Sequence, residues 1–212
     1  MVFCFAGTIR APLHSPGIVR QGAHEGFTRN VASGPTRAAS CIIAPMVPRV
    51  LQLNISNGGV PKTAIDYAEI TPLGIIGDVH RNPKYHGGPE RALLLVASEV
   101  VDKVRAEGWT VFYGALGENL TTAGLDHRSW RPGQCFRIGS VLIELTFPRQ
   151  PCANLDPYGP GIQARLFDRR VKVLDPSSPR WGESGFYAAV LQPGTIAAND
   201  IIEARNAGRA TL

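Results

Sequence analysis

The feature that most restricts the fold of this chain is how often glycine and proline interrupt it. Its 212 residues include 23 glycines and 17 prolines, and the apolar stretches between them are short. Glycine and proline mark turns and end regular elements, so the sequence favours many short strands over long helices. Because 44% of the residues are hydrophobic, the chain can still bury a core. We therefore predict a mainly β (α+β) domain, a barrel or a sandwich, with one or two peripheral helices.

Residue patterns place these elements along the chain. The predicted strands cover residues 50–54, 64–70, 91–96, 136–138, 141–147, 186–191 and 201–204. Turn sequences at 139–140 and 193–194 predict two hairpins, one joining the fourth and fifth of these strands and one joining the last two. A helix is predicted over 99–107, with Ser98 as its N-cap and Gly108 just after its end.

The charge is unevenly distributed along the chain. Of the net charge of +5, residues 1–45 carry +3 and residues 46–212 carry only +2. Residues 1–45 show no periodic pattern, so we expect a disordered or mis-called N-terminal extension, with a targeting segment as the alternative. The folded domain is predicted to cover residues 46–212. Its near-neutral charge gives no reason to expect nucleic-acid binding, and its apolar runs are too short to span a membrane.

Two clusters of polar residues lie in glycine-rich segments. Segment 77–91 (GDVHRNPKYHGGPER) brings histidines and basic side chains into a loop, where Gly87 and Gly88 expose N–H groups that could approach an anion. Segment 114–120 (GALGENL) places a carboxylate and an amide between turn glycines and a strand. Taken alone, the first could be an ordinary solvated loop and the second an ordinary turn.

A third cluster ends a strong predicted strand. In segment 146–152 (TFPRQPC), two prolines end the strand and stiffen its exit. Cys152 therefore lies on a rigid strand end beside Arg149, a setting that favours a thiolate. The alternative is that Cys152 is only a small buried apolar residue.

Taken together and in this order, these residues resemble a known family, the MOSC domain, named after the C-terminal domain of molybdenum cofactor sulfurase. The segments that carry the resemblance are 85–92 (YHGGPERA), 117–120 (GENL), 137–139 (RIG) and 148–152 (PRQPC). The resemblance covers residues 48–203 and is greatest to the small, stand-alone bacterial members. It implies a β-barrel that binds the molybdenum cofactor (molybdopterin), with Cys152 as the sulfur ligand to molybdenum.

Residue chemistry then suggests which groups hold the rest of the cofactor. The candidate cofactor-binding residues are Arg81, His86, Gly87, Gly88, Arg91, Asn119, Arg149 and Gln150. The basic and glycine residues would bind the phosphate, and the two amides would bind the pterin edge. Candidate catalytic residues are Cys152, with His86, Glu118 and His80 as proton donors.

The resemblance implies a cytoplasmic reductase of N-hydroxylated small molecules such as hydroxylaminopurines, amidoximes or hydroxamic acids. A separate flavin or iron–sulfur reductase would supply electrons, because this chain has no electron-carrying motif. Two alternatives remain open. One is a non-catalytic carrier of the cofactor, or a sulfur-transfer module that acts through a Cys152 persulfide. The other is a zinc site built from His80, His86 and Cys152.

Overall fold

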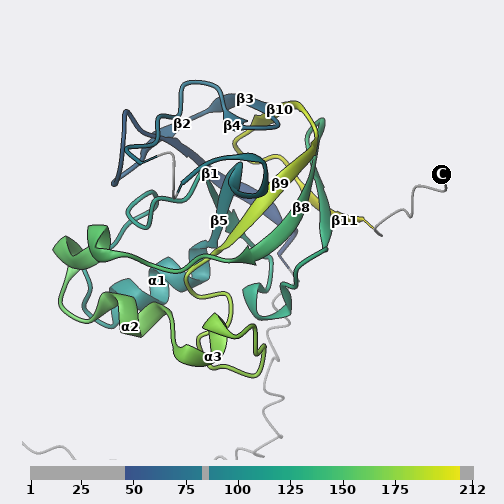
Figure 1. The fold of residues 1–212 in the computed structure, drawn as a ribbon. Coiled ribbons are helices and arrows are strands. Elements are labelled where there is room, and N and C mark those ends of the chain that lie inside the picture. Colours follow the sequence, from purple (N-terminus) through teal and green to yellow (C-terminus); the bar gives the residue numbers. More distant parts are fainter. Residues whose placement is uncertain (1–45, 83–85, 206–212) are drawn as a thin grey trace, which may run out of the picture. The chain divides into compact units, whose positions relative to one another are not determined.

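The structure, a computed structural model, describes residues 46–82 and 86–205 (Figure 1). The expectations for residues 1–45, and the motif residues Lys84 and Tyr85, lie outside the described residues.

Two sheets form the described domain, which confirms the mainly β prediction. Across the larger, eight-stranded sheet the order is β11 (Ile202–Arg205), β7 (Cys135–Ile138), β8 (Val141–Pro148), β9 (Phe186–Gln192), β5 (Leu93–Ala97), β6 (Leu120–Ala123), β1 (Arg49–Ile55) and β2 (Thr63–Ile65). Only β5 and β6 are parallel; the other neighbours are antiparallel. The smaller sheet has the order β10 (Gly194–Ala197), β3 (Tyr67–Thr71) and β4 (Gly74–Ile75).

The prediction of a barrel was wrong, because the large sheet is mixed and does not close. On the edge of β1 opposite β6, Arg49 forms an isolated bridge with Ile201, just before β11. A few backbone hydrogen bonds surround this bridge, but no continuous ladder joins β1 to β11. Residues 53–55 of β1 pair on that same edge with β2. The short β2 therefore occupies the edge that a continuous β1–β11 ladder would need.

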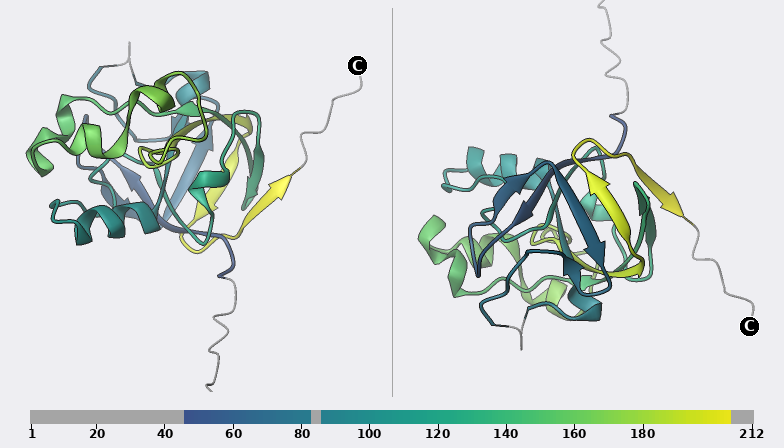
Figure 2. Two further views of the ribbon diagram at one scale, coloured as in Figure 1. Left: turned by 90° about the horizontal axis from the view of Figure 1, so that it is seen from below. Right: turned by 90° about the horizontal axis from the view of Figure 1, so that it is seen from above.

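Three α-helices and three 3-10 helices lie among the described residues, where one or two helices were expected. They are α1 (Ser98–Ala106), α2 (Ile162–Leu166), α3 (Arg169–Lys172), η1 (Pro89–Arg91), η2 (His127–Ser129) and η3 (Ala153–Tyr158). The α-helices lie on one side of the domain and the small sheet lies on the other (Figures 1 and 2). Because α2 and α3 are each shorter than two turns, no helical period could reveal them.

The best predicted helix is confirmed, with one detail corrected. Helix α1 matches the expected range, and its Val100, Val101 and Val104 are buried. Gly108 follows its end with φ +106°, a conformation that suits glycine. Ser98, however, does not cap the helix, because the N-cap position is Ala97 and no side chain caps it.

Two strand predictions needed correction, while the hairpin of β7 and β8 is confirmed. The segment predicted as one strand over 64–70 divides at Asp66, because β2 pairs with β1 and β3 pairs with β10. The predicted hairpin between 186–191 and 201–204 is not formed. After β9 the chain crosses to the small sheet as β10, and β11 then pairs with β7.

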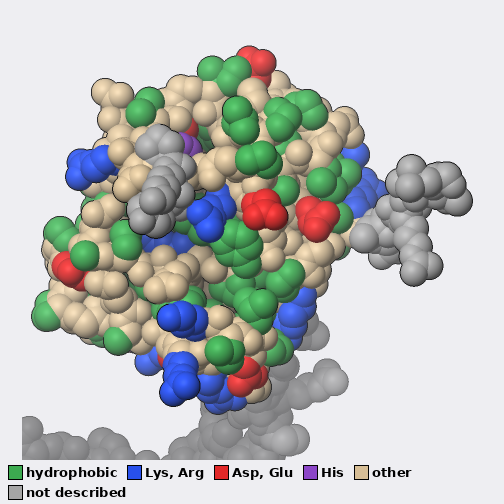
Figure 3. All heavy atoms as spheres, viewed as in Figure 1, with side chains coloured by type: hydrophobic (Ala, Val, Ile, Leu, Met, Phe, Trp, Pro, Cys, Tyr) green, Lys and Arg blue, Asp and Glu red, His purple; other side chains and the backbone are tan. Residues whose placement is uncertain are grey.

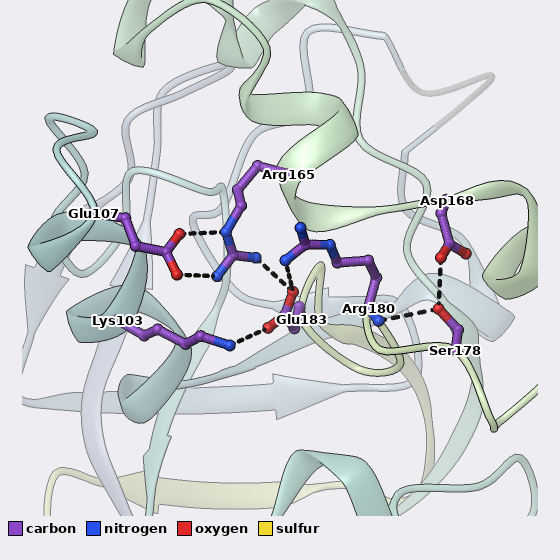
Figure 4. A network of polar contacts seen from close by, with 7 residues as sticks. All are labelled: Lys103, Glu107, Arg165, Asp168, Ser178, Arg180 and Glu183. Carbon is purple, nitrogen blue, oxygen red and sulfur yellow. Dashed lines mark hydrogen bonds and ion pairs between the residues drawn. The ribbon is translucent and has the colours of Figure 1, made fainter.

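A buried ionic network fixes the helical side of the domain (Figure 4). Glu183, which is 2% exposed, accepts hydrogen bonds from Lys103 of α1 at 3.0 Å, from Arg165 of α2 and from Arg180 at 3.2 Å. Arg165 also forms a two-pronged ion pair with Glu107, which follows α1. These contacts join α1, α2 and the segment that leads into β9.

We predict that Glu183→Gln lowers the free energy of unfolding by about 3 kcal/mol, since it removes the buried carboxylate that three cations share and leaves Arg165 paired with Glu107 alone. Glu203→Gln is a matched control, because it breaks only the exposed pair with Arg205 and should cost less than about 1 kcal/mol. Urea unfolding of both variants and the wild type measures the difference. Equal losses in the two variants would contradict the assignment.

Candidate functional site

A buried carboxylate organises one wall of the site. The Asp78 side chain is 2% exposed; it accepts hydrogen bonds from Ser56 N at 2.9 Å and Asn119 Nδ2 at 2.8 Å, and forms an ion pair with Lys62. His80 Nε2 lies 3.8 Å from the same carboxylate. Neither Asp78 nor Lys62 was predicted as a site residue. The two are 16 positions apart and only the tertiary fold brings them together.

Asn119 joins this carboxylate to the sheet. Its Oδ1 accepts a hydrogen bond from Leu94 N at 3.1 Å, and its Nδ2 donates to both Asp78 and Asn54 O, the latter at 3.4 Å. Both amide hydrogens are thus used within the protein. Asn119 does line the site, but a contact from this amide to a pterin edge stays a prediction.

Glu118 points away from the site, toward a neighbouring turn. Its Oε1 accepts hydrogen bonds from Gly114 N at 2.6 Å and from Thr121 Oγ1 at 3.2 Å, and the residue is fully buried. Burial raises the pKa of the Glu118 carboxyl. Since Glu118 lines neither hollow described below, its predicted role as a proton donor has no geometric support.

The end of β8 positions a buried cation. Arg149, which is 4% exposed, donates its N–H to Gly185 O at 2.9 Å, and its carbonyl accepts the Ser184 hydroxyl at 2.5 Å. Its Nη2 donates to Leu116 O at 3.0 Å, whereas Nη1 is buried without a hydrogen-bond partner. Burial lowers the pKa of Arg149. An unpartnered buried guanidinium nitrogen beside a cavity is a site for an anionic or carbonyl ligand.

This guanidinium borders a cavity of about 300 Å³, here called the basic hollow. Its basic and imidazole side chains are Lys62, His80, Arg81, His86, Arg91 and Arg149. Among the described residues that line it, none is Asp or Glu. With Lys62 neutralised by Asp78, the arginines leave an excess of positive charge that favours an anion.

A second cavity of about 620 Å³, here called the apolar hollow, adjoins the first. Its apolar walls are Phe147, Pro148, Pro151, Phe167, Val171 and Leu174. The two hollows share four lining residues, namely His86, Arg91, Cys152 and Tyr187. Cys152 therefore lies where they meet. Figure 3 shows Lys and Arg side chains near the middle of one face, with apolar side chains alongside.

The other four predicted cofactor-binding residues are Gly87, Gly88, Arg81 and Gln150, and they do not all line the same hollow. Gly87 lines the basic hollow with φ +83°, and a Cβ there would lie 3.2 Å from His80 Nδ1, so the ring packs against bare backbone. Gly88 lines neither hollow and instead accepts the Arg91 N–H at 2.9 Å. Arg81 lines the basic hollow, and Gln150 lines only the apolar one.

Both histidines of the site have lowered pKa values. Burial lowers the pKa of His80, and burial together with the positive charge of Arg149 lowers the pKa of His86. Within the part of the chain that the structure describes, no group of three or more His, Cys, Asp or Glu side chains could hold a metal ion. The zinc alternative built on His80, His86 and Cys152 is therefore not supported.

Fold and site together define a small, mainly β protein whose cation-lined pocket presents a single thiol. The family model of the MOSC domain matches residues 82–203, more than half of the chain. The chain therefore belongs to the MOSC domain family. No helix among the described residues is long and apolar enough to cross a membrane.

Similar proteins agree with this family assignment. Protein YiiM of Escherichia coli is 32% identical over 143 residues, and the uncharacterized protein YflK of Bacillus subtilis is 30% identical over 138 residues. These alignments cover 63% and 62% of this chain, but only 57% and 56% of the two relatives. The chain thus matches little more than half the length of each relative.

Solved structures show the same fold. The crystal structure of YiiM from Escherichia coli has a TM-score of 0.56 and 26% identity, and covers 76% of this chain and 71% of its own. YuaD from Bacillus subtilis has a TM-score of 0.56 and 20% identity, and covers 74% and 94% respectively. At this lower identity the second likeness concerns the fold alone.

The lowered histidine pKa values predict a loss of stability in mild acid. Burial lowers the pKa of His80, His86 and His127 in the folded protein, so the unfolded chain binds more protons below about pH 6.5. The free energy of unfolding should therefore fall between pH 7.5 and pH 5.5. The raised pKa of the buried Glu118 carboxyl opposes this fall to the same extent in the wild type and in the variant below. The free energy of unfolding should fall less in His86→Gln. Urea unfolding at both pH values measures this, and an equal fall in both proteins would contradict it.

Proposed function

We propose that this protein binds the molybdenum cofactor through Cys152 and reduces N-hydroxylated small molecules. The observation that carries the proposal is the position of Cys152, at the junction of a cation-lined hollow and an apolar one. A thiolate is a soft ligand that suits a soft metal centre, and Cys152 lies four residues after the end of β8, at the N-cap position of the 3-10 helix η3. Membership of the MOSC domain family supports the same assignment.

The donor set of the basic hollow fits the anionic part of such a cofactor. Arg149 Nη1 is buried and has no hydrogen-bond partner, so a phosphate or a pterin carbonyl would satisfy it. Arg81, Arg91 and His86 line the same space, and Gly87 lines it with its bare backbone packed against the His80 ring. These are the residues that would hold the cofactor. Among the described residues that line the basic hollow there is no Asp or Glu that would repel the anionic groups of the cofactor.

The bound cofactor would supply two-electron redox chemistry next to the Cys152 sulfur. The overall reaction is R–NHOH plus two electrons and two protons to R–NH₂ and water: the N–O bond breaks, the nitrogen gains a proton and the oxygen leaves as water. His86 is the histidine that lines both hollows, so it is placed to deliver a proton to the leaving oxygen. Its lowered pKa makes its cationic form a stronger acid.

The electrons would come from a separate protein, a flavin or iron–sulfur reductase. Reduced donors of this kind are available in the cytoplasm, where we expect the reaction to take place. The alternative of a carrier or a Cys152 persulfide transfer module uses the same thiol, and the experiment below distinguishes it by turnover.

Replacing Cys152 with Ser should remove molybdenum from the protein and abolish reduction of 6-hydroxylaminopurine, because a hydroxyl is a poor ligand for a soft metal. Cys135→Ser is the matched control, since Cys135 is buried in β7 and lines neither hollow. Both variants are purified from a host that makes the cofactor. Metal and pterin content and turnover with a reductase are then measured.

We expect about one molybdenum per chain in the wild type and in Cys135→Ser, and less than about a tenth of that in Cys152→Ser. Retained molybdenum and full turnover in Cys152→Ser would overturn the proposal. Bound cofactor without any turnover in the wild type would favour the carrier.

A further inference from the structure

An exposed surface beside the thiol combines positive charge with apolar side chains. We call it the α3 surface, and it consists of Arg169, Arg170, Lys172, Val173 and Leu174, all of them exposed. Figure 3 shows Lys and Arg side chains gathered over α3, with apolar side chains beside them. Lys172 and Leu174 also line the same hollow as Cys152. The α3 surface therefore begins at the edge of the candidate site.

The positive charge of the α3 surface is not neutralised by its own acidic neighbours. Asp168 caps the start of α3 with its side chain, and Asp175 forms an ion pair with Arg170 at 2.9 Å. The side chains of Arg169 and Lys172 have no hydrogen-bond or ion-pair partner among the described residues. Two exposed cations without counter-ions attract an acidic partner.

The turn that ends α3 holds a leucine where glycine is the usual residue. Leu174 has φ +60°, and its N–H donates to Val171 O at 3.0 Å, while Asp175 N donates to Arg170 O at 2.9 Å. Such a pair of hydrogen bonds ends many helices with a glycine in the left-handed conformation. Leu174 is 52% exposed, so burial does little to offset this strain. With Val173, which is 69% exposed, it forms an apolar centre next to the cations.

We propose that the α3 surface docks the acidic face of a small electron-carrying protein, an iron–sulfur or flavin carrier. This inference rests on the proposed function, which needs two electrons from outside the chain. An apolar centre with a charged rim is typical of protein interfaces, and weak electron-transfer complexes are among the smallest of these. Because electron transfer slows steeply with distance, the carrier must approach the reacting centre closely. Docking at α3 places it over the hollow that Cys152 lines.

Arg169→Glu tests the electrostatic part of the proposal. Arg169 lines neither hollow, and glutamate is well tolerated at the start of a helix. Arg205→Glu is the matched control, because it makes the same change of net charge at an exposed arginine of β11, an edge strand of the large sheet. The molybdenum-loaded proteins reduce 6-hydroxylaminopurine with one of two donors. One is a plant-type ferredoxin, an acidic carrier kept reduced by its NADPH-dependent reductase, and the other is dithionite-reduced methyl viologen, a small cation that needs no docking surface.

We expect Arg169→Glu to raise the KM for ferredoxin about tenfold and to leave turnover with methyl viologen unchanged, whereas Arg205→Glu should change that KM less than about twofold. Raising NaCl from about 50 mM to about 300 mM should increase the wild-type KM for ferredoxin, because salt screens the attraction. The increase should be smaller in Arg169→Glu. A purely structural role of Arg169 would not alter this salt dependence.

Leu174→Gly tests the apolar centre. Glycine adopts the left-handed conformation without strain, so the variant should unfold at the same or a higher urea concentration than the wild type. Its KM for ferredoxin should nevertheless rise about threefold, because the centre of the interface has lost its largest apolar side chain.

An unchanged KM for ferredoxin in both Arg169→Glu and Leu174→Gly, or equal effects of the two arginine variants, would overturn the inference. Turnover with methyl viologen but none with ferredoxin would also overturn it, and would leave the proposed function intact. If neither donor supports turnover, the proposed function fails and the inference fails with it. Binding to phosphatidylglycerol vesicles that Arg169→Glu removes, with no change in the KM for ferredoxin, would assign the surface to a membrane instead.

Discussion

The buried Asp78 carboxylate is the constraint on which the described site depends. It lies in the loop that follows β4, and its partners come from three other segments: Ser56 from the end of β1, Lys62 from the residue before β2 and Asn119 from the start of β6. A buried carboxylate is costly unless it is paired and hydrogen-bonded, so these segments must meet at this point. The same pairing neutralises Lys62, so the arginines determine the charge of the basic hollow.

A second constraint places the thiol. The ladder between β8 and β9 ends at the pair Pro148–Phe186 and is extended by the hydrogen bond from Arg149 N to Gly185 O. A Cβ on Gly185 would lie 2.4 Å from Leu95 O, so only glycine permits this close contact with β5. Cys152 then precedes the 3-10 helix η3. The position of Cys152 therefore depends on the pairing of β8 with β9 and on the packing of Gly185 against β5, which are central strands of the large sheet.

Several residues that line the two hollows could be selected from the sequence, whereas the hydrogen bonds that hold the site together could not. Arg149, Cys152 and His86 were predictable because prolines and glycines mark where strands end and loops expose polar groups. Glu118 and Asn119 belong to an equally polar segment, yet their side chains turn inward to bond Gly114 N and Leu94 N. No local pattern distinguishes these two outcomes, since the partners lie on other elements. The open sheet was missed for a similar reason: it depends on which strand pairs with the free edge of β1.

The two hollows share four lining residues, and Arg91 is the one whose side chain contacts both a cationic and an aromatic surface. Arg91 lines the basic hollow, where its charge would attract a phosphate, and its guanidinium packs against Phe147 in the apolar one. Changes at residues that line only one hollow should therefore combine additively, whereas a change at any of the four shared residues alters both hollows. Among these four, Arg91 is the planar cation next to the thiol. Because Lys cannot reproduce the stacking of a guanidinium, arginine is the side chain that fits both surfaces.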